Sequence, residues 1–139
     1  MATVKWGTTL RLLGSARLSI TDATTSYFDF GTPDNISLLT AANYNPGDRI
    51  LVCITTDSDG TTDTITAVIQ DADDNAGSFG TGATAVTSGT LLLGSGDKAG
   101  AFGVQVQAGR PWLKIGVTES GATDTIACHC SVYALASNA

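Results

Sequence analysis

The sequence is poor in charge and in the side chains that carry out chemistry. Only 14% of its 139 residues are charged, and it has one histidine and one glutamate. Aromatic residues make up 6% of the chain, which leaves few rings to stack against sugars. Glycoside hydrolysis by paired carboxylates is therefore improbable. No catalytic signature is present, so we expect neither an enzyme nor a bound cofactor.

Long apolar segments are also missing. No stretch approaches the roughly 20 residues that a membrane-spanning helix needs. Residues 1–20 lack the continuous apolar region of a signal peptide. We expect synthesis in a cytoplasm and no membrane partner. The three cysteines cannot all pair with one another, and in that compartment reduced thiols are the default.

The net charge of −6 is unevenly distributed along the chain. Residues 1–20 contain Lys5, Arg11 and Arg17 and no acidic residue, a net charge of +3. The remaining residues carry thirteen acids against four bases, a net charge of −9. Such an acidic body repels phosphate backbones, so nucleic acid is not an expected partner. The basic segment suits a contact between molecules or subunits, or it is a solvated tail without a role.

Sixteen glycines and abundant Thr, Ser, Val and Ile favour strands separated by turns. We expect one all-β antiparallel sandwich of about eight strands, and the count favours a jelly roll over an immunoglobulin-like fold. Residues 1–16 show no period and are predicted to form an irregular N-terminal arm, which leaves 17–139 as the sandwich domain. Strand-like segments occur at 17–20, 26–30, 49–56, 63–70, 90–93, 101–107, 112–118 and 125–135, and 36–42 is either a strand or one helical turn.

Two pairs of neighbouring strands are predicted to form hairpins. The first joins 49–56, a near-continuous apolar run expected to be covered on both faces, to 63–70. The second joins 112–118 to 125–135, where apolar residues recur at every second position and so share one face. The inward set is Leu113, Ile115, Val117, Ile126, Cys128, Cys130 and Val132, with Trp112, His129 and Tyr133 on the opposite face.

The run Cys128-His129-Cys130 is the strongest candidate in the sequence for a metal site or a nucleophile. Tetrahedral zinc needs four ligands, and a strand turns the two thiols one way and the imidazole the other. Adding Cys53 still leaves the set incomplete, and the imidazole cannot activate either neighbouring thiol as a nucleophile. The motif predicts two small core residues that flank one exposed histidine.

Two Asp-rich stretches, 57–63 and 71–75, resemble pieces of calcium loops, but neither supplies the terminal glutamate. Asp, Asn and Gly also form turns for backbone reasons, so turns are favoured and a weak calcium site is the alternative. Residues 71–89 are the longest stretch without a period and are predicted to form a long loop anchored by Phe79. Within it, 80–85 fits a loose dinucleotide fingerprint by chance, since no helix follows.

Four segments follow one another in a recognisable order: Tyr27-Phe-Asp-Phe-Gly31, Asn43-Tyr-Asn-Pro-Gly-Asp-Arg-Ile50, Val68-Ile-Gln-Asp-Ala-Asp73 and Gly109-Arg-Pro-Trp-Leu-Lys-Ile115. This succession resembles the small capsid cement, or decoration, proteins of tailed bacteriophages. The resemblance implies a jelly-roll sandwich that forms dimers or trimers and clamps the outside of a capsid. It also implies that there is no active site.

We therefore expect a structural virion protein on the capsid exterior that stabilises contacts between major capsid proteins. The partners would be the major capsid protein and further copies of this chain. The candidate interface residues are Lys5, Trp6, Leu10, Arg11, Leu12, Leu13, Arg17 and Phe79. The alternative is a carbohydrate- or calcium-binding β-sandwich module of a phage adhesion protein, which would use the Asp-rich turns and an exposed Trp112 and Tyr133.

Overall fold

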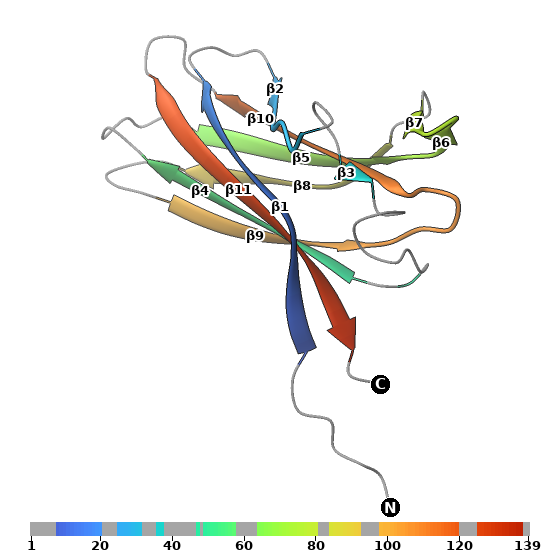
Figure 1. Ribbon diagram of the computed structural model, residues 1–139. Helices are drawn as coiled ribbons and strands as arrows, with labels where there is room; N and C mark the ends of the chain where they lie inside the picture. The colour runs from blue at the N-terminus through green and yellow to red at the C-terminus, as the bar shows by residue number, and fades with distance from the viewer. Residues whose placement is uncertain are drawn as a thin grey trace, which may run out of the picture.

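The computed structural model describes residues 8–20, 25–31, 36–37, 47, 49–57, 64–80, 84–92, 98–119 and 125–137. Every regular element in these ranges is a β-strand, and the two larger sheets pack face to face (Figure 1). The protein is an all-β antiparallel sandwich, as the sequence predicts. Within the described ranges there is no helix that is long and apolar enough to cross a membrane.

The sandwich consists of a four-stranded sheet and a five-stranded sheet. Sheet A contains, in spatial order, β1 (Thr8–Ile20), β11 (Ile126–Ser137), β4 (Arg49–Asp57) and β9 (Lys98–Gln105). In sheet B, two short strands share one edge of β10, and the set is β2 (Ser26–Tyr27), β3 (Ile36–Ser37), β10 (Trp112–Glu119), β5 (Thr64–Ala72) and β8 (Thr84–Leu92). A separate small hairpin is formed by β6 (Asp74–Asn75) and β7 (Ser78–Phe79).

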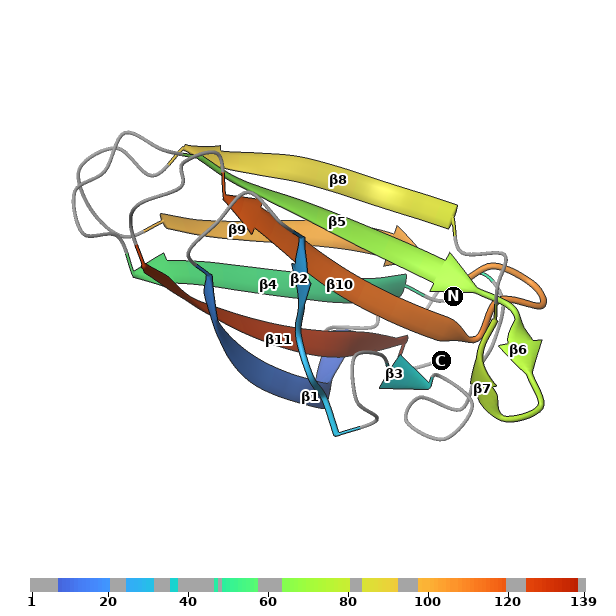
Figure 2. The same cartoon turned by 90° about the horizontal axis from the view of Figure 1, so that it is seen from above.

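The pairing of the strands is nested, which defines a jelly roll. The first strand, β1, pairs with the last, β11, and β2 and β3 pair with β10. Inside these pairs, β4 pairs with β9 and β5 pairs with β8, all antiparallel. The chain therefore crosses from one sheet to the other at most of its connections (Figure 2).

Both predicted hairpins are wrong, although their strands exist. β4 lies in sheet A and β5 in sheet B, and likewise β11 lies in sheet A and β10 in sheet B. Alternation of apolar residues fixes which side of a strand faces the core. Because the core lies between the two sheets, a hairpin and a crossing connection satisfy the same alternation. The sequence pattern could not separate the two.

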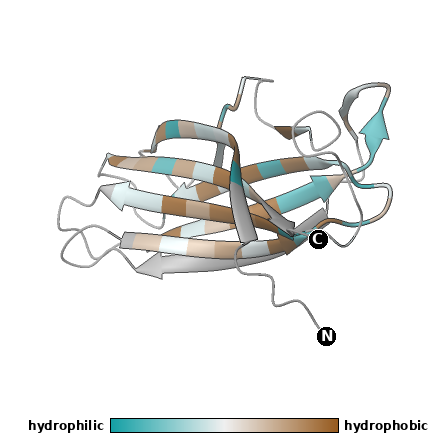
Figure 3. Ribbon diagram, turned by 60° about the horizontal axis from the view of Figure 1, so that its bottom comes forward, coloured by the Kyte–Doolittle hydropathy of each residue, from teal (hydrophilic) through white to brown (hydrophobic). Residues whose placement is uncertain are grey.

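The inward-facing residues predicted for the last two strands are confirmed. All seven are at most 3% exposed and belong to one continuous core between the sheets. Apolar residues alternate with polar ones along the strands (Figure 3). The larger neighbours of this set in the core are Phe28, Ile50, Val52, Ile54, Ile65 and Ile69.

Residues 8–16 are not the irregular arm that the sequence predicted. They belong to β1, which pairs with β11 over its full length, and only 1–7 of that arm lie outside the described residues. A β-bulge between Leu12 and Gly14 breaks the alternation, because Leu13 and Gly14 both turn toward the core. Past Leu135, the last residue of β11 that pairs with β4, β1 and β11 continue as a two-stranded ribbon beyond the other strands (Figure 1).

The long loop predicted for 71–89 is also wrong. β5 continues to Ala72, the β6–β7 hairpin follows, and β8 begins at Thr84. The hairpin turns at Ala76 and Gly77, whose φ angles of 50° and 85° fit a type I′ turn. Its strands have two residues each and are mostly polar, so they left no periodic signal.

Candidate functional site

The outer face of sheet A is the surface best suited to binding a partner. Sheet B packs on the other side of sheet A, and no described element lies on this outer face (Figures 1 and 2). β4, predicted to be covered on both faces, is central in sheet A but is covered by described elements on one face only. Its outward residues Leu51 and Cys53 are half-buried, by neighbours within the sheet.

An apolar row crosses this face from one edge of the sheet to the other. Leu12 of β1 lies opposite Tyr133 of β11, which lies opposite Leu51 of β4, which lies opposite Gly103 of β9. Leu12 is 55% exposed and stands out as an exposed large apolar side chain among the described residues. The bulge at Leu13 is what turns Leu12 outward, so one extra residue in β1 creates this end of the row.

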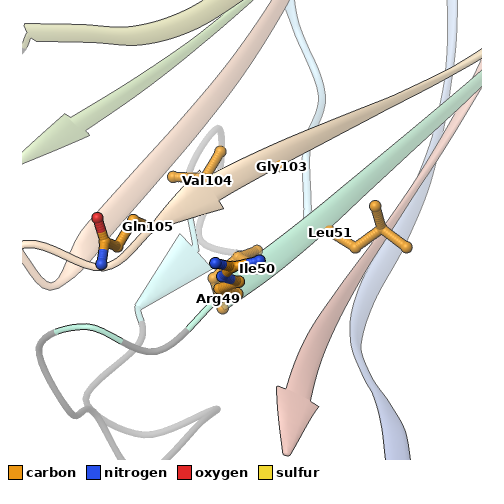
Figure 4. A pocket seen from close by; sticks show the side chains of 6 residues that line it. All are labelled: Arg49, Ile50, Leu51, Gly103, Val104 and Gln105. Carbon is orange, nitrogen blue, oxygen red and sulfur yellow. The ribbon is translucent and has the colours of Figure 1, made fainter. Parts of the chain in front are cut away.

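The row ends in a hollow because its last residue has no side chain. A cavity of about 350 Å³ opens above β4 and β9, and a Cβ built on Gly103 would meet no atom within 4 Å. Arg49, Leu51 and Gln105 surround the hollow (Figure 4). Ile50 and Val104 also line it, and since their side chains are buried in the core, they contribute main chain to its floor. The hollow is large enough to accept a side chain of a partner.

The charge of this face is opposite in sign to the charge of the chain. Arg17 lies opposite His129 on the same face, and Arg49 lies beside the hollow. Among the residues that the structure describes, the strands of sheet A contain one acidic residue, Asp57, at the end of β4 opposite Ala127. In a protein of net charge −6, the face thus combines an apolar row with basic side chains.

The structure places the predicted interface residues in different parts of the molecule. Leu12 and Arg17 lie on the outer face of sheet A, Arg11 is exposed, and Leu13 packs into the core. Leu10 is placed only by its backbone, opposite Leu135, and Lys5 and Trp6 lie outside the described residues.

Phe79, the remaining predicted interface residue, lies on the outer side of sheet B. Its ring centroid is 5.5 Å from the Lys114 ammonium, which also lies 4.1 Å from the ring centroid of Tyr27. The Trp112 indole N–H donates to a carboxylate oxygen of Asp74 at 2.8 Å, and Trp112 is only 6% exposed. The predicted exposure of Trp112 is therefore wrong, since the β6–β7 hairpin supplies a partner that the sequence did not reveal.

The cysteines and the histidine divide between the two faces as the strand geometry predicted. Cys128 and Cys130 are buried, whereas His129 points outward and is half-buried. Burial, with a smaller effect of the charge on Glu119, raises the pKa of Cys128 to about 11. Burial, followed by Cys53, raises the pKa of Cys130 to about 12. Both thiols therefore remain protonated at neutral pH, and a protonated thiol is neither nucleophile nor metal ligand.

The acidic residues near the β6–β7 hairpin serve the fold. Asp71 is buried and accepts a hydrogen bond from Arg110 Nε at 2.5 Å. Asp74 accepts from Trp112 and, at 3.3 Å, from the backbone N–H of Gly77. Among the residues that the structure describes, no three His, Cys, Asp or Glu side chains are grouped to hold a metal ion. Of the other Asp-rich stretch, 58–63 lies outside those residues.

Sequence reasoning missed Leu51 and Gly103 as members of the binding face. Leu51 was hidden in an apolar run that looked buried on both sides. The available signal was that the set Arg49, Leu51, Cys53 and Thr55 is less apolar than Ile50, Val52 and Ile54. Gly103 gave no signal, because only the register with β4 places it at the end of the apolar row.

No family model matches the chain, and no curated protein matches it in sequence. Among solved structures, the vertex protein P5 of PRD1 superimposes with a TM-score of 0.56 and 10% identity, over 95% of this chain and 100% of that chain. A CBM4 carbohydrate-binding module gives a TM-score of 0.53 and 15% identity, over 91% of this chain and 79% of the module. What these proteins share with the chain is the fold.

A third similar structure is the enzymatically active domain of tailspike protein 4 from bacteriophage CBA120. Its TM-score is 0.51 at 17% identity, over 91% of this chain but only 19% of the tailspike chain. The sandwich thus corresponds to a small part of that larger protein.

Proposed function

We propose that this chain is a structural virion protein, a cement or decoration protein that binds the outside of a bacteriophage capsid. Its partners would be the major capsid protein, whose mutual contacts it would stabilise, and further copies of itself. The observation that carries the proposal is the outer face of sheet A, with its apolar row and basic side chains. The resemblance in sequence order and the jelly-roll fold shared with a phage vertex protein support the same function.

This face has the chemistry of a protein-binding surface. Stable interfaces combine a central apolar or aromatic cluster with a polar rim, and Tyr and Arg are enriched in them. Here Leu12, Tyr133 and Leu51 would form the centre, and Arg17 and Arg49 the rim. A complementary capsid surface would carry carboxylates around an apolar side chain that enters the hollow beside Gly103.

The binding test uses purified particles and recombinant full-length chain. The chain should be present in virions purified by density gradient, and it should rebind to capsids from which it has been removed. Leu12→Asp places a carboxylate in the centre of the row and should weaken rebinding at least tenfold. Asn75→Asp on the exposed β6–β7 hairpin adds the same charge outside this face and should rebind like the wild type. Absence of the chain from particles, or full rebinding of Leu12→Asp, would refute the proposal.

A carbohydrate-binding module of a phage adhesion protein is the second candidate. The shared fold with CBM4 and the placement of Tyr133 in an open sheet face beside a hollow favour it. A glycan array should then give a specific ligand, and Tyr133→Ala should abolish that binding, because the aromatic ring would stack on a sugar. The module could instead bind calcium through residues 57–63. A calcium titration followed by thermal unfolding tests that possibility.

A further inference from the structure

The edges of the two sheets differ in how they are protected from pairing with another chain. An edge strand exposes unpaired N–H and C=O groups, and natural proteins block such edges with bulges, charges or very short strands. β1 has a bulge and carries Arg11 and Arg17, and β2 and β3 have two residues each. β8 has a register irregularity in its pairing with β5.

β9 is the least protected edge in the described sheets, since it has neither a bulge nor a short length and carries a charge only at its first residue. It pairs in unbroken register with β4 for eight residues, and its other side has no described partner. It contains no proline, and its single charged residue is the first, Lys98. Such a weakly protected edge in an otherwise protected sandwich indicates that the edge is covered in the assembled state.

We propose that β9 pairs antiparallel with β9 of a second copy of the chain, centred on Ala101, and joins two copies of sheet A into one eight-stranded sheet. The proposal rests on the self-association included in the proposed function, but it requires no contact with a capsid. The pairing relates the two copies by a twofold axis, so each copy presents the same surface to the other.

The residues of β9 complement one another in size when Ala101 lies on the axis. Phe102, which packs against the core, then lies opposite Gly100 of the second copy and covers a position without a side chain. On the outer side, exposed Ala99 lies opposite Gly103. A register shifted by two residues would instead place Phe102 opposite Phe102. A shift by one would align the core side of one copy with the outer side of the other.

Charge also favours a second copy over a charged partner. Lys98 would lie opposite Val104, so no like charges face each other although the chain is acidic overall. The pairing would also extend the outer face of sheet A across the axis, and two apolar rows would then lie on one continuous surface. A capsid would meet both rows at once, which strengthens binding without any new contact.

The expected interface is small. With Ala101 on the axis, the seven residues 98–104 pair and extend about 24 Å, and two sheets about 10 Å apart with their side chains form an edge surface roughly 20 Å thick. The buried area is then about 500 Å² per copy and about 1,000 Å² in total, at the lower limit for a specific interface. β8 lies on the same side of the sandwich as β9 and would contribute the part of this interface that belongs to sheet B (Figure 2). We therefore expect a reversible dimer with a dissociation constant on the order of micromolar.

Sedimentation equilibrium of the full-length chain across the micromolar range tests the proposal, with no capsid present. The wild type should pass from monomer to dimer with rising concentration. Ala101→Lys places two ammonium groups next to the axis and should weaken dimerisation at least tenfold. The control is Ser15→Lys, which adds the same charge to the same outer row of sheet A on the opposite edge strand. Its dimer should match that of the wild type.

Hydrogen exchange gives a second readout, because the backbone amides of β9 should exchange more slowly in the dimer. A wild type that stays monomeric, or a dimer that Ala101→Lys and Ser15→Lys affect equally, overturns the proposal. If the chain forms a dimer through β9 but does not bind capsids, the pairing of β9 is supported and the proposed capsid function is refuted. If the chain binds capsids but stays monomeric, capsid binding is supported and the pairing of β9 is refuted.

Discussion

At the scale of single residues, the ion pair of Arg110 with Asp71 joins the segment before β10 to the end of β5. The Asp71 side chain is 3% exposed, whereas that of Arg110 is 26% exposed. Arg110 also donates from Nη2 to the Asp71 carbonyl oxygen at 2.9 Å. Loss of the cation therefore leaves a carboxylate in a buried site, whereas loss of the carboxylate leaves a cation that can reach water.

We predict that Arg110→Ala lowers the free energy of unfolding by about 3 kcal/mol, because breaking a buried pair from one side is strongly destabilising. Asp71→Asn should cost less, since the amide oxygen still accepts a hydrogen bond. Urea denaturation measures both values. Arg49→Ala, on the exposed outer face of sheet A, should stay within about 0.5 kcal/mol of the wild type. Equal effects of the Arg110 and Arg49 variants would contradict the structural role of the pair.

The buried thiols predict how stability changes at high pH. Their pKa values rise from 9.0 to about 11 for Cys128 and about 12 for Cys130, so the folded state keeps protons that the unfolded chain releases. Their contribution is complete below pH 9 and is lost as the pH rises through the folded-state values. Each thiol should lower the free energy of unfolding by about 1.4 kcal/mol per pH unit in that window.

Urea denaturation from about pH 7 to about pH 10.5 tests this dependence. The double variant Cys128→Ala/Cys130→Ala should be less stable than the wild type at neutral pH but should lose less stability above pH 9. All other side chains are the same in the two proteins, so the difference isolates the thiols. Parallel curves would show that these thiols do not carry the effect.

Two glycines on outer faces offer a matched pair of substitutions. A Cβ on Gly116 would lie 2.8 Å from the Tyr27 ring and from Thr25 Cγ2, whereas one on Gly103 would meet nothing within 4 Å. Gly116→Ala would push Tyr27 off β10 and should cost about 1 to 2 kcal/mol of stability. Gly103→Ala should be neutral or slightly stabilising, because alanine loses less backbone entropy than glycine. Thermal or urea unfolding compares the two, and a larger cost at Gly103 would contradict the packing.

At the scale of elements, β1 decides what can be removed from the N-terminus. Deletion of residues 1–7 leaves β1 whole and serves as the comparison. Deletion of residues 1–16 removes Leu13 and Ala16 from the core and exposes the edge of β11. This larger deletion should cost at least about 3 kcal/mol or prevent folding. Circular dichroism and urea unfolding distinguish the two, and a stable 1–16 deletion would show that the first half of β1 is dispensable.

At the scale of the whole molecule, the charge distribution predicts salt-sensitive binding. An acidic chain that presents Arg17 and Arg49 on its binding face should meet an acidic capsid surface. Capsid binding should therefore weaken with rising ionic strength. Arg17→Gln should weaken binding about three- to tenfold at low salt, and the difference should shrink at high salt. Asn75→Asp makes the same change in net charge away from this face and should have little effect, which separates local from overall charge.

The amino-acid sequence was sufficient to predict the fold class and most of the core. The alternation in 112–118 and 125–135 identified the inward residues of β10 and β11 except Glu119 and Ala134, because period two follows directly from the pleat of a strand. The same rule placed the two thiols and the imidazole on opposite faces. The bulge in β1 breaks the alternation and the polar β6–β7 hairpin has none, so an arm and a loop were predicted there in place of strands.

Which strands pair and which sheet faces stay open became clear from the three-dimensional structure alone. Periodicity records burial on one side of a strand, but it carries no information about the neighbour on either edge. Leu12, Tyr133, Leu51 and Gly103 come from four strands far apart in the sequence and meet only through the register of sheet A. The candidate binding face therefore depends on the nested pairing of the strands. The sandwich core, by contrast, can be predicted from the alternation of apolar residues within each strand.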